Sequence, residues 1–235
     1  MSDAFSRTKM LIGSDNFEKL KKSKVIVFGV GGVGGYVVEA LARSGIERID
    51  ICDNDVISES NINRQIVALN STIGMLKVDV IKKRILDINP NILCNTYPIF
   101  VGEDNIDSFD FANYDYIIDA IDTVSAKLLI ITKAKESSVK IISSMGTGNK
   151  LDPLKFMLSD INQTSVCPLA KVMRYELRKK GINHLKCLYS KEVPVKLENK
   201  IIDDKNNKSI PASIAYMPSV AGLIIAQEVI KDLLL

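Results

Sequence analysis

The amino-acid sequence predicts an α/β fold, with a mostly parallel sheet and helices flanking it. Short apolar runs of the kind that buried parallel strands show alternate along the chain with segments of helical periodicity. A glycine-rich turn joins the first of these strands to a helix. Alternating strands and helices are typical of parallel sheets with right-handed crossovers.

The glycine turn lies between an apolar run at residues 25–28 and a predicted helix at 36–44. It reads G-x-G-G-x-G, and its four glycines are Gly29, Gly31, Gly32 and Gly34. Glycines let the backbone turn tightly and approach a phosphate, and the helix that follows offers free N–H groups. The turn therefore predicts a Rossmann-like sheet that binds a nucleotide.

An acidic side chain supports the nucleotide site. Asp53 stands nineteen residues after Gly34, at the end of the next predicted strand, at 49–52. An acid at this place can hold the hydroxyls of a ribose. The turn and the acid by themselves are more typical of dinucleotide binding than of any other nucleotide.

The remaining elements follow in the same order of strand and helix. Further strands are expected at 91–97, 114–120 and 139–144, and further helices at 72–89 and 125–138. The pattern then changes to a loop and strand at 151–160, a helix at 168–180 and an apolar helix at 219–235. We expect residues 1–150 to form the nucleotide-binding core with an N-terminal helical segment. Residues 151–235 are then a C-terminal extension of the same domain that serves substrate binding and dimerisation.

Composition excludes several other classes of protein. The chain has 235 residues, 46% of them hydrophobic, and a formal net charge of +3, which permits nucleic acid as a partner without demanding it. It has no apolar run of membrane-spanning length and no secretory signal at its start. Four widely spaced cysteines form no C-x-x-C pair. We therefore expect a cytoplasmic protein with reduced thiols and no contact with membranes.

The residues after Asp53 favour a triphosphate over a dinucleotide. A polar loop brings Asn61, Arg64 and Gln65 close together in sequence, and Lys77 follows near the start of a helix. An arginine fork binds phosphate oxygens bidentately, whereas hydride transfer has no need of one beside the ribose. An NAD-dependent oxidoreductase stays an alternative in which these residues coincide by chance.

The fourth predicted strand ends in two acids, Asp119 and Asp122. Open α/β sheets bind ligands at the carboxyl ends of their strands. Asp122 lies just past that end, where it could hold Mg²⁺ on the phosphates. Asp119 is closer to the strand, and we expect it to be structural.

Taken together, these motifs resemble the ATP-binding domain of the E1-like family, the ThiF, MoeB and HesA relatives of the ubiquitin-activating enzymes. The resemblance covers about residues 5–150, and its motifs are the glycine turn, Asp53-x-Asp55, Ser60-Asn61-x-Asn63-Arg64-Gln65, Lys77 and Asp119-x-x-Asp122. It implies ATP with Mg²⁺, adenylation of a carboxylate, and a homodimer. It also implies that Arg7 reaches the triphosphate of the partner subunit, so that Arg7, Arg64, Lys77 and Asp122 form the catalytic set.

The second half of the chain narrows the resemblance. Members that activate sulfur carrier proteins have paired C-x-x-C zinc motifs, and this chain has none. Residues 143–153 and 164–170 instead resemble the tRNA threonylcarbamoyladenosine dehydratase branch. That likeness implies adenylation of the threonyl carboxylate on a modified adenosine beside the anticodon, followed by ring closure with loss of AMP. An activating enzyme for a sulfur carrier protein remains the alternative, and the sequence leaves open whether a cysteine-desulfurase-type sulfur-trafficking partner assists.

A basic helix follows this stretch. Lys171, Arg174 and Arg178 fall at positions i, i+3 and i+7 and therefore share one face. This face is either an ordinary solvated surface or a contact for the phosphate backbone of tRNA. Cys167, just before the helix, is the one thiol worth testing as a nucleophile, although ring closure requires none from the protein.

Overall fold

The computed structural model describes residues 4–199, 202–203 and 208–235. Its main sheet has seven strands in the order β3-β2-β1-β4-β5-β7-β6, all parallel except β6, which pairs with β7 in the antiparallel sense. The strands are β1 (Lys24–Phe28), β2 (Arg48–Cys52), β3 (Thr96–Tyr97), β4 (Tyr116–Asp119), β5 (Lys140–Ser144), β6 (Phe156–Asp160) and β7 (Lys186–Ser190). A small antiparallel pair, β8 (Ile202–Asp203) and β9 (Lys208–Ser209), lies apart from it. The expected mostly parallel sheet is confirmed.

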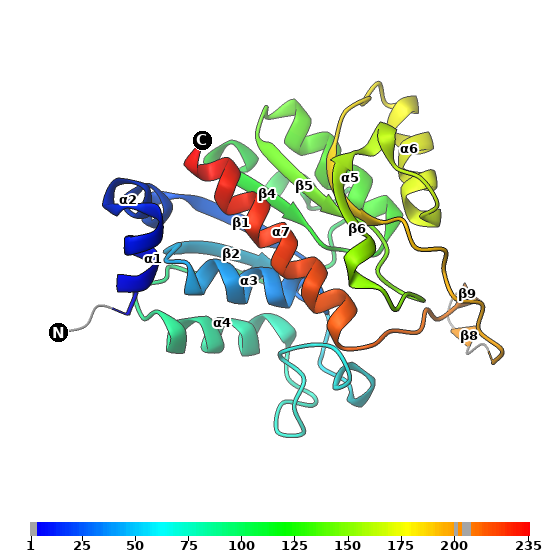
Figure 1. Cartoon of the computed structure of the whole chain (residues 1–235), viewed down its shortest axis with the longest axis horizontal. Helices are drawn as coiled ribbons and strands as arrows, with labels where there is room; N and C mark the ends of the chain where they lie inside the picture. Colours follow the sequence, from blue (N-terminus) through cyan, green and yellow to red (C-terminus); the bar gives the residue numbers. More distant parts are fainter. Residues whose placement is uncertain (1–3, 200–201, 204–207) are drawn as a thin grey trace.

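Helices cover both faces of the sheet (Figure 1). One face carries α3 (Gly34–Arg43), α4 (Lys77–Ile88) and α7 (Tyr216–Leu234). The other carries α5 (Val124–Glu136) and α6 (Pro168–Lys179). Two short helices, α1 (Ser6–Ile12) and α2 (Ser14–Lys22), precede β1 and lie beside the C-terminal end of α7.

The position of β1 in the middle of the sheet explains why residues 25–28 are all apolar. Val25 and Val27 face the hydrophobic core under α3, α4 and α7. Ile26 and Phe28 face the second core, under α5 and α6. A strand that is covered on both faces needs apolar side chains at every position, which explains the continuous run.

Three elements differ from the expectations. The helix predicted at 72–89 begins at Lys77, because the chain before it folds back on Ile57: the N–H groups of Ile57 and Gly74 bond to the carbonyls of Met75 and Ile57. The strand predicted at 91–97 is reduced to 96–97, since the Asp50 carboxylate accepts the N–H of Asn95 at 2.9 Å. No strand was predicted at residues 186–190, where the structure has β7, the strand that lies between β5 and β6 in the sheet.

The C-terminal extension completes the same sheet as the core. β6 and β7 belong to it, and α7 packs across α3. A Cβ atom on Gly222 would lie 2.4 Å from the Val33 carbonyl oxygen, so the two helix backbones are in close contact there. Within residues 4–199, 202–203 and 208–235, no helix combines the length and apolar character that a membrane span requires.

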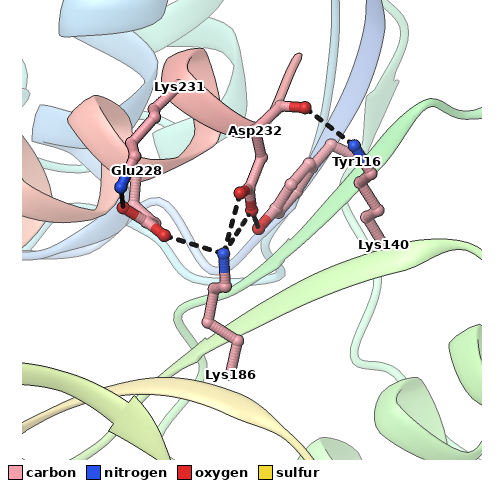
Figure 2. Close-up of polar contacts among 6 residues, drawn as sticks. All are labelled: Tyr116, Lys140, Lys186, Glu228, Lys231 and Asp232. Carbon is pink, nitrogen blue, oxygen red and sulfur yellow. Dashed lines mark hydrogen bonds and ion pairs between the residues drawn. The ribbon is translucent and has the colours of Figure 1, made fainter. Parts of the chain in front are cut away.

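An ion-pair cluster fastens the C-terminal half of α7 to three strands (Figure 2). The Lys186 ammonium on β7 donates to Glu228 at 2.7 Å and to both oxygens of Asp232, at 2.8 and 2.7 Å. The Tyr116 hydroxyl on β4 donates to the Asp232 carboxylate at 2.6 Å, and the Lys140 ammonium on β5 donates to the main-chain carbonyl of Asp232 at 2.7 Å. Burial alone would raise the pKa of Asp232, but the hydrogen bonds from Lys186 and Tyr116 outweigh it and hold the pKa below its ordinary value.

Substituting Asp232→Asn should lower the free energy of unfolding by about 1.5–3 kcal/mol near neutral pH, because charged hydrogen bonds are lost. The pKa of Asp232 is lower in the folded chain than in the unfolded one, so its contribution is present above the unfolded value of about 3.9 and is lost as the pH falls further. Urea unfolding of both proteins across this range should therefore converge at acid pH. Lys231→Met, which removes only an exposed partner of Glu228, is the control. A difference that persists unchanged below pH 4 would contradict this account.

Candidate functional site

The glycine turn is crowded by backbone at the carboxyl edge of the sheet. A Cβ atom on Gly34 would lie 1.8 Å from the Gly29 carbonyl oxygen, and one on Gly29 would lie 2.8 Å from that of Ala120. Gly29 also has φ +85°, in the left-handed region. These two positions admit only glycine, and they bring the start of α3 directly against the end of β1.

Asp53 holds this turn from the side of β2. Its Oδ2 accepts the N–H of Val30 at 2.8 Å, and its Oδ1 accepts the N–H of Asp55 at 2.9 Å. Burial raises the pKa of Asp53 despite the nearby positive charge of Lys77. The carboxylate therefore fixes the turn through both of its oxygens.

Arg64 and Gln65 lie beside two of the glycines. The Arg64 Cγ is 3.7 Å from the position of a Cβ on Gly32, and the Gln65 Nε2 is 3.7 Å from that on Gly31. Arg64 Nη1 donates to the carbonyl of Ser60 and to Asn63 Oδ1, both at 2.8 Å. Its Nε and Nη2 have no hydrogen-bond partner in the described part of the chain, so most of the fork is available to a phosphate.

Gln65 carries an orphaned polar atom. Its Oε1 is buried and has no hydrogen-bond partner among the residues that the structure describes. A buried oxygen without a hydrogen bond destabilises the fold, and a ligand that donates a hydrogen bond to it would remove this penalty. Asn61, also buried, instead uses its Oδ1 to accept the N–H of Ser58 at 3.2 Å and thereby shapes the polar loop. The turn and Gln65 together fit a nucleotide that offers hydroxyl or amino donors.

Lys77 is held in place by a carboxylate. Its side chain is 5% exposed, and its ammonium lies 2.6 Å from Asp55 Oδ2, while Asp55 itself is 59% exposed. The Lys77 N–H also bonds to the Asp55 carbonyl at 3.0 Å. The pair therefore links the start of α4 to the end of β2, close to the Asp53 carboxylate.

Asp122 stands in the loop after β4, with its carboxylate exposed. Its one polar side-chain partner in the described chain is the Thr123 hydroxyl, at 3.4 Å. No group of three or more His, Cys, Asp or Glu side chains within those residues could hold a metal ion. A magnesium ion at Asp122 would therefore depend on phosphate oxygens and water for its other ligands, which is how Mg²⁺ is usually bound.

Beneath this loop lies an ion pair with no exposure to solvent. Lys127 on α5 is 2.9 Å from Asp119 Oδ2, and it donates to the carbonyls of Ile121 and Ser144 at 3.0 and 2.8 Å. Asp119 also accepts the Ser143 hydroxyl at 2.6 Å. The prediction that Asp119 is structural is confirmed. Lys127 was missed, because a lysine within a helical repeat carries no sign of burial.

Arg7 does not join the other residues within one chain. It is exposed on α1, next to α2, where the Phe5 and Phe17 rings are 5.7 Å apart. Phe17 packs against Gly45, at the amino edge of the sheet. The glycine turn is at the carboxyl edge, so Arg7 lies at the opposite end of the molecule from it.

The basic helix is only partly a free surface. Lys171 and Arg178 are exposed, and Arg178 makes one long contact of 3.4 Å with Asn162. Arg174 donates to the Thr164 carbonyl at 2.7 Å and also contacts the Thr164 hydroxyl, so it supports the loop before the helix. Cys167 is 2% exposed and immediately precedes α6.

Comparisons with known proteins place this site in a family. The ThiF family model matches residues 5–235. The chain belongs to the ThiF family.

Its relatives include a Bacillus subtilis protein named tRNA threonylcarbamoyladenosine dehydratase, which is 42% identical over 100% of this chain and 96% of its own length. The structure of the Escherichia coli tRNA N6-threonylcarbamoyladenosine dehydratase in complex with ATP superposes with a TM-score of 0.89 at 29% identity, covering 99% of this chain and 96% of that one. A Candida glabrata adenylyltransferase and sulfurtransferase, UBA4, is 37% identical over only 56% of this chain.

Removing the Lys127 ammonium should destabilise the folded protein. In Lys127→Met, Asp119 would be left as a buried, unpaired charge, and the free energy of unfolding should fall by about 3–5 kcal/mol. The double variant Asp119→Asn/Lys127→Met should recover part of this loss. Lys133→Met, on the same helix, removes a partly exposed partner of the exposed Asp107 and should change stability little. Urea unfolding measures all three, and equal effects of Lys127→Met and Lys133→Met would contradict the buried pair.

Proposed function

We propose that this chain is an ATP-dependent tRNA threonylcarbamoyladenosine dehydratase. The observation that carries the proposal is the set of groups at the carboxyl edge: a glycine turn braced by Asp53, with the partly paired guanidinium of Arg64 and the orphaned oxygen of Gln65 beside it. Likeness over the whole length to relatives of that name supports the choice of substrate.

The reaction turns a poor electrophile into a good one. A threonyl carboxylate oxygen attacks the α-phosphorus of ATP, the bond to the β-phosphate oxygen breaks, and pyrophosphate leaves. A nucleophilic atom of the same modified nucleoside then attacks the activated carbonyl, loses its proton and expels AMP. The substrate loses one water in total, whose oxygen leaves on AMP, so the reaction requires no protein nucleophile.

The protein positions charge for this transfer. Arg64 lies beside the turn and Lys77 near the Asp53 that braces it, and both would neutralise phosphate oxygens as negative charge moves toward pyrophosphate. Asp53 would accept hydrogen bonds from the ribose while it braces the turn, Asp55 would hold Lys77, and Asn61 keeps the loop in shape. Mg²⁺, held by Asp122 and the phosphates, would supply further positive charge.

Arg7 requires a second copy of the chain. Because it lies at the opposite edge from its own glycine turn, the role that the family resemblance implies for it would be at the site of a partner in a homodimer. A cytoplasmic location and a desulfurase-type partner remain predictions from the sequence. The sulfur-carrier alternative is less well supported, since the UBA4 relative matches little more than half of this chain.

Arg64→Ala should lower kcat/KM for ATP by roughly 10–100-fold, because a charge-assisted phosphate contact is lost. The assay is AMP release in the presence of tRNA that carries N6-threonylcarbamoyladenosine. Arg48→Ala removes an exposed arginine at the far edge of β2 and serves as the control. Wild-type kinetics in Arg64→Ala would exclude this arginine from the phosphate site.

Complementation between two inactive variants tests whether Arg7 acts on the site of the partner subunit. Arg7→Ala and Asp122→Asn should each be inactive alone, yet a refolded equal mixture should recover about a quarter of wild-type activity, because each mixed dimer contains one intact site. The double variant in a single chain, mixed with itself, is the control and should stay inactive. If the mixture gains nothing while dimers form, Arg7 does not act across the interface.

The basic helix should contribute to tRNA affinity and to its dependence on salt. Reversing Lys171 and Arg178 to Glu removes two exposed charges, and the slope of log affinity against log salt should flatten by about 1–2. Arg174 is left intact because it supports the loop at Thr164. The control reverses Lys22 and Lys135, which are exposed on two other helices, α2 and α5. Equal slopes in the two double variants, measured by electrophoretic shift, would assign the helix to a solvated surface.

A further inference from the structure

A small cavity opens beside the candidate site. Its volume is about 260 Å³, and it lies between the loop after β5 and the segment that leads into α7. Apolar side chains form most of its wall, namely Leu151, Val195, Leu197, Ala212 and Ile214. Sites for small molecules usually span roughly 300–1,000 Å³, so this cavity suits one ring rather than a whole nucleotide.

The cavity is held open by one asparagine. Asn149 has φ +57°, and its N–H donates to the Ala212 carbonyl at 2.8 Å. Its Oδ1 accepts the Ala212 N–H at 2.7 Å, and its carbonyl accepts the N–H of Val195 at 2.8 Å. Asn149 therefore joins three segments, and the cavity is formed before any ligand binds.

The wall of the cavity is connected to the phosphate site by Asn63. The Asn63 Nδ2 donates to the Ser213 carbonyl at 3.1 Å, and its Oδ1 accepts from Arg64 at 2.8 Å. The same segment then reaches the glycine turn, where Pro218 Cβ is 3.0 Å from the position of a Cβ on Gly32. The Asn63 side chain thus links Ser213, a lining residue of the cavity, to Arg64, the arginine that would bind the triphosphate.

Two polar groups of the lining residues are left without partners. Neither Asn149 Nδ2 nor the Ser213 hydroxyl makes a hydrogen bond within the described residues. Apolar walls with an amide donor and a hydroxyl are the means by which enzymes hold a base that has been taken out of its stack. Lys150 also lines the cavity, but it is buried and its ammonium donates to the Gly146 carbonyl, so the lining offers little to a phosphate.

We infer that this cavity receives the adenine ring of the nucleotide to be modified. The inference rests on the proposed function, in which the threonyl carboxylate must reach the α-phosphate beside Arg64. The carbamoyl group joins that carboxylate to the ring by a few bonds, so the ring lies next to the arginine, where the cavity is. Ribose and phosphates of the tRNA remain outside, because the cavity has room for one ring system.

The test uses two conservative variants. Asn149→Asp keeps the Oδ1 acceptor and tolerates the left-handed backbone, but it replaces the free donor with a negative charge. Ser213→Ala removes only the hydroxyl and keeps the carbonyl that binds Asn63. Asn113→Asp, an exposed change at the opposite edge of the sheet, is the matched control. The substrate is tRNA that carries N6-threonylcarbamoyladenosine, and KM is measured separately for tRNA and for ATP.

Asn149→Asp should raise KM for the tRNA by about 10-fold or more, and Ser213→Ala by a few-fold, with KM for ATP unchanged in both. Unchanged KM for tRNA in both variants, with an active wild-type enzyme, would overturn the base-binding cavity and leave the proposed function standing. A rise in KM for ATP as large as that for tRNA would assign the cavity to ATP and would also overturn it. A wild-type enzyme that releases no AMP with this tRNA would overturn both proposals.

Discussion

The site depends on close contact between backbones on both sides of α3, the helix that follows the glycine turn. Gly34 presses the start of α3 against the Gly29 carbonyl, and Gly222 lets α7 approach the Val33 carbonyl from the other side. A methyl group at either place would overlap with a main-chain oxygen. The N-terminus of α3 is therefore fixed before any ligand arrives, and the Asp53 carboxylate adds a hydrogen bond at Val30. Such preorganisation is what allows a turn to bind phosphate without further cost.

Helix α7 connects the stability of the fold to the geometry of the site. Its C-terminal half is fastened to β4 and β7 through side-chain carboxylates, and to β5 through the main-chain carbonyl of Asp232 (Figure 2). Its first turn places Pro218 against Gly32, and the segment before it forms a wall of the cavity and binds Asn63. One helix thus spans the molecule from the amino edge, where Arg7 lies, to the carboxyl edge, where the chemistry is expected.

The sequence predicted local structure well where the residue types in a motif occur together in few other structures. Four spaced glycines and Asp53 predicted the turn correctly, because few other folds need that combination. Buried polar contacts were not predictable, since Lys127 and Asn149 look like ordinary surface residues until the fold brings Asp119 and Ala212 to them. The short strand β7 was missed for a similar reason: only its neighbours in the sheet, β5 and β6, make its five residues a strand. The same limit applies to Arg174, whose bond to Thr164 depends on a loop conformation.

The central claim is that this site adenylates and then cyclises a modified nucleoside in tRNA. The most direct measurement incubates the protein with ATP, Mg²⁺ and tRNA that carries N6-threonylcarbamoyladenosine, and then determines nucleoside masses and AMP. The account predicts that the modified nucleoside loses the mass of one water molecule while AMP forms in equal amount. An unchanged nucleoside, with or without cleavage of ATP, would contradict it.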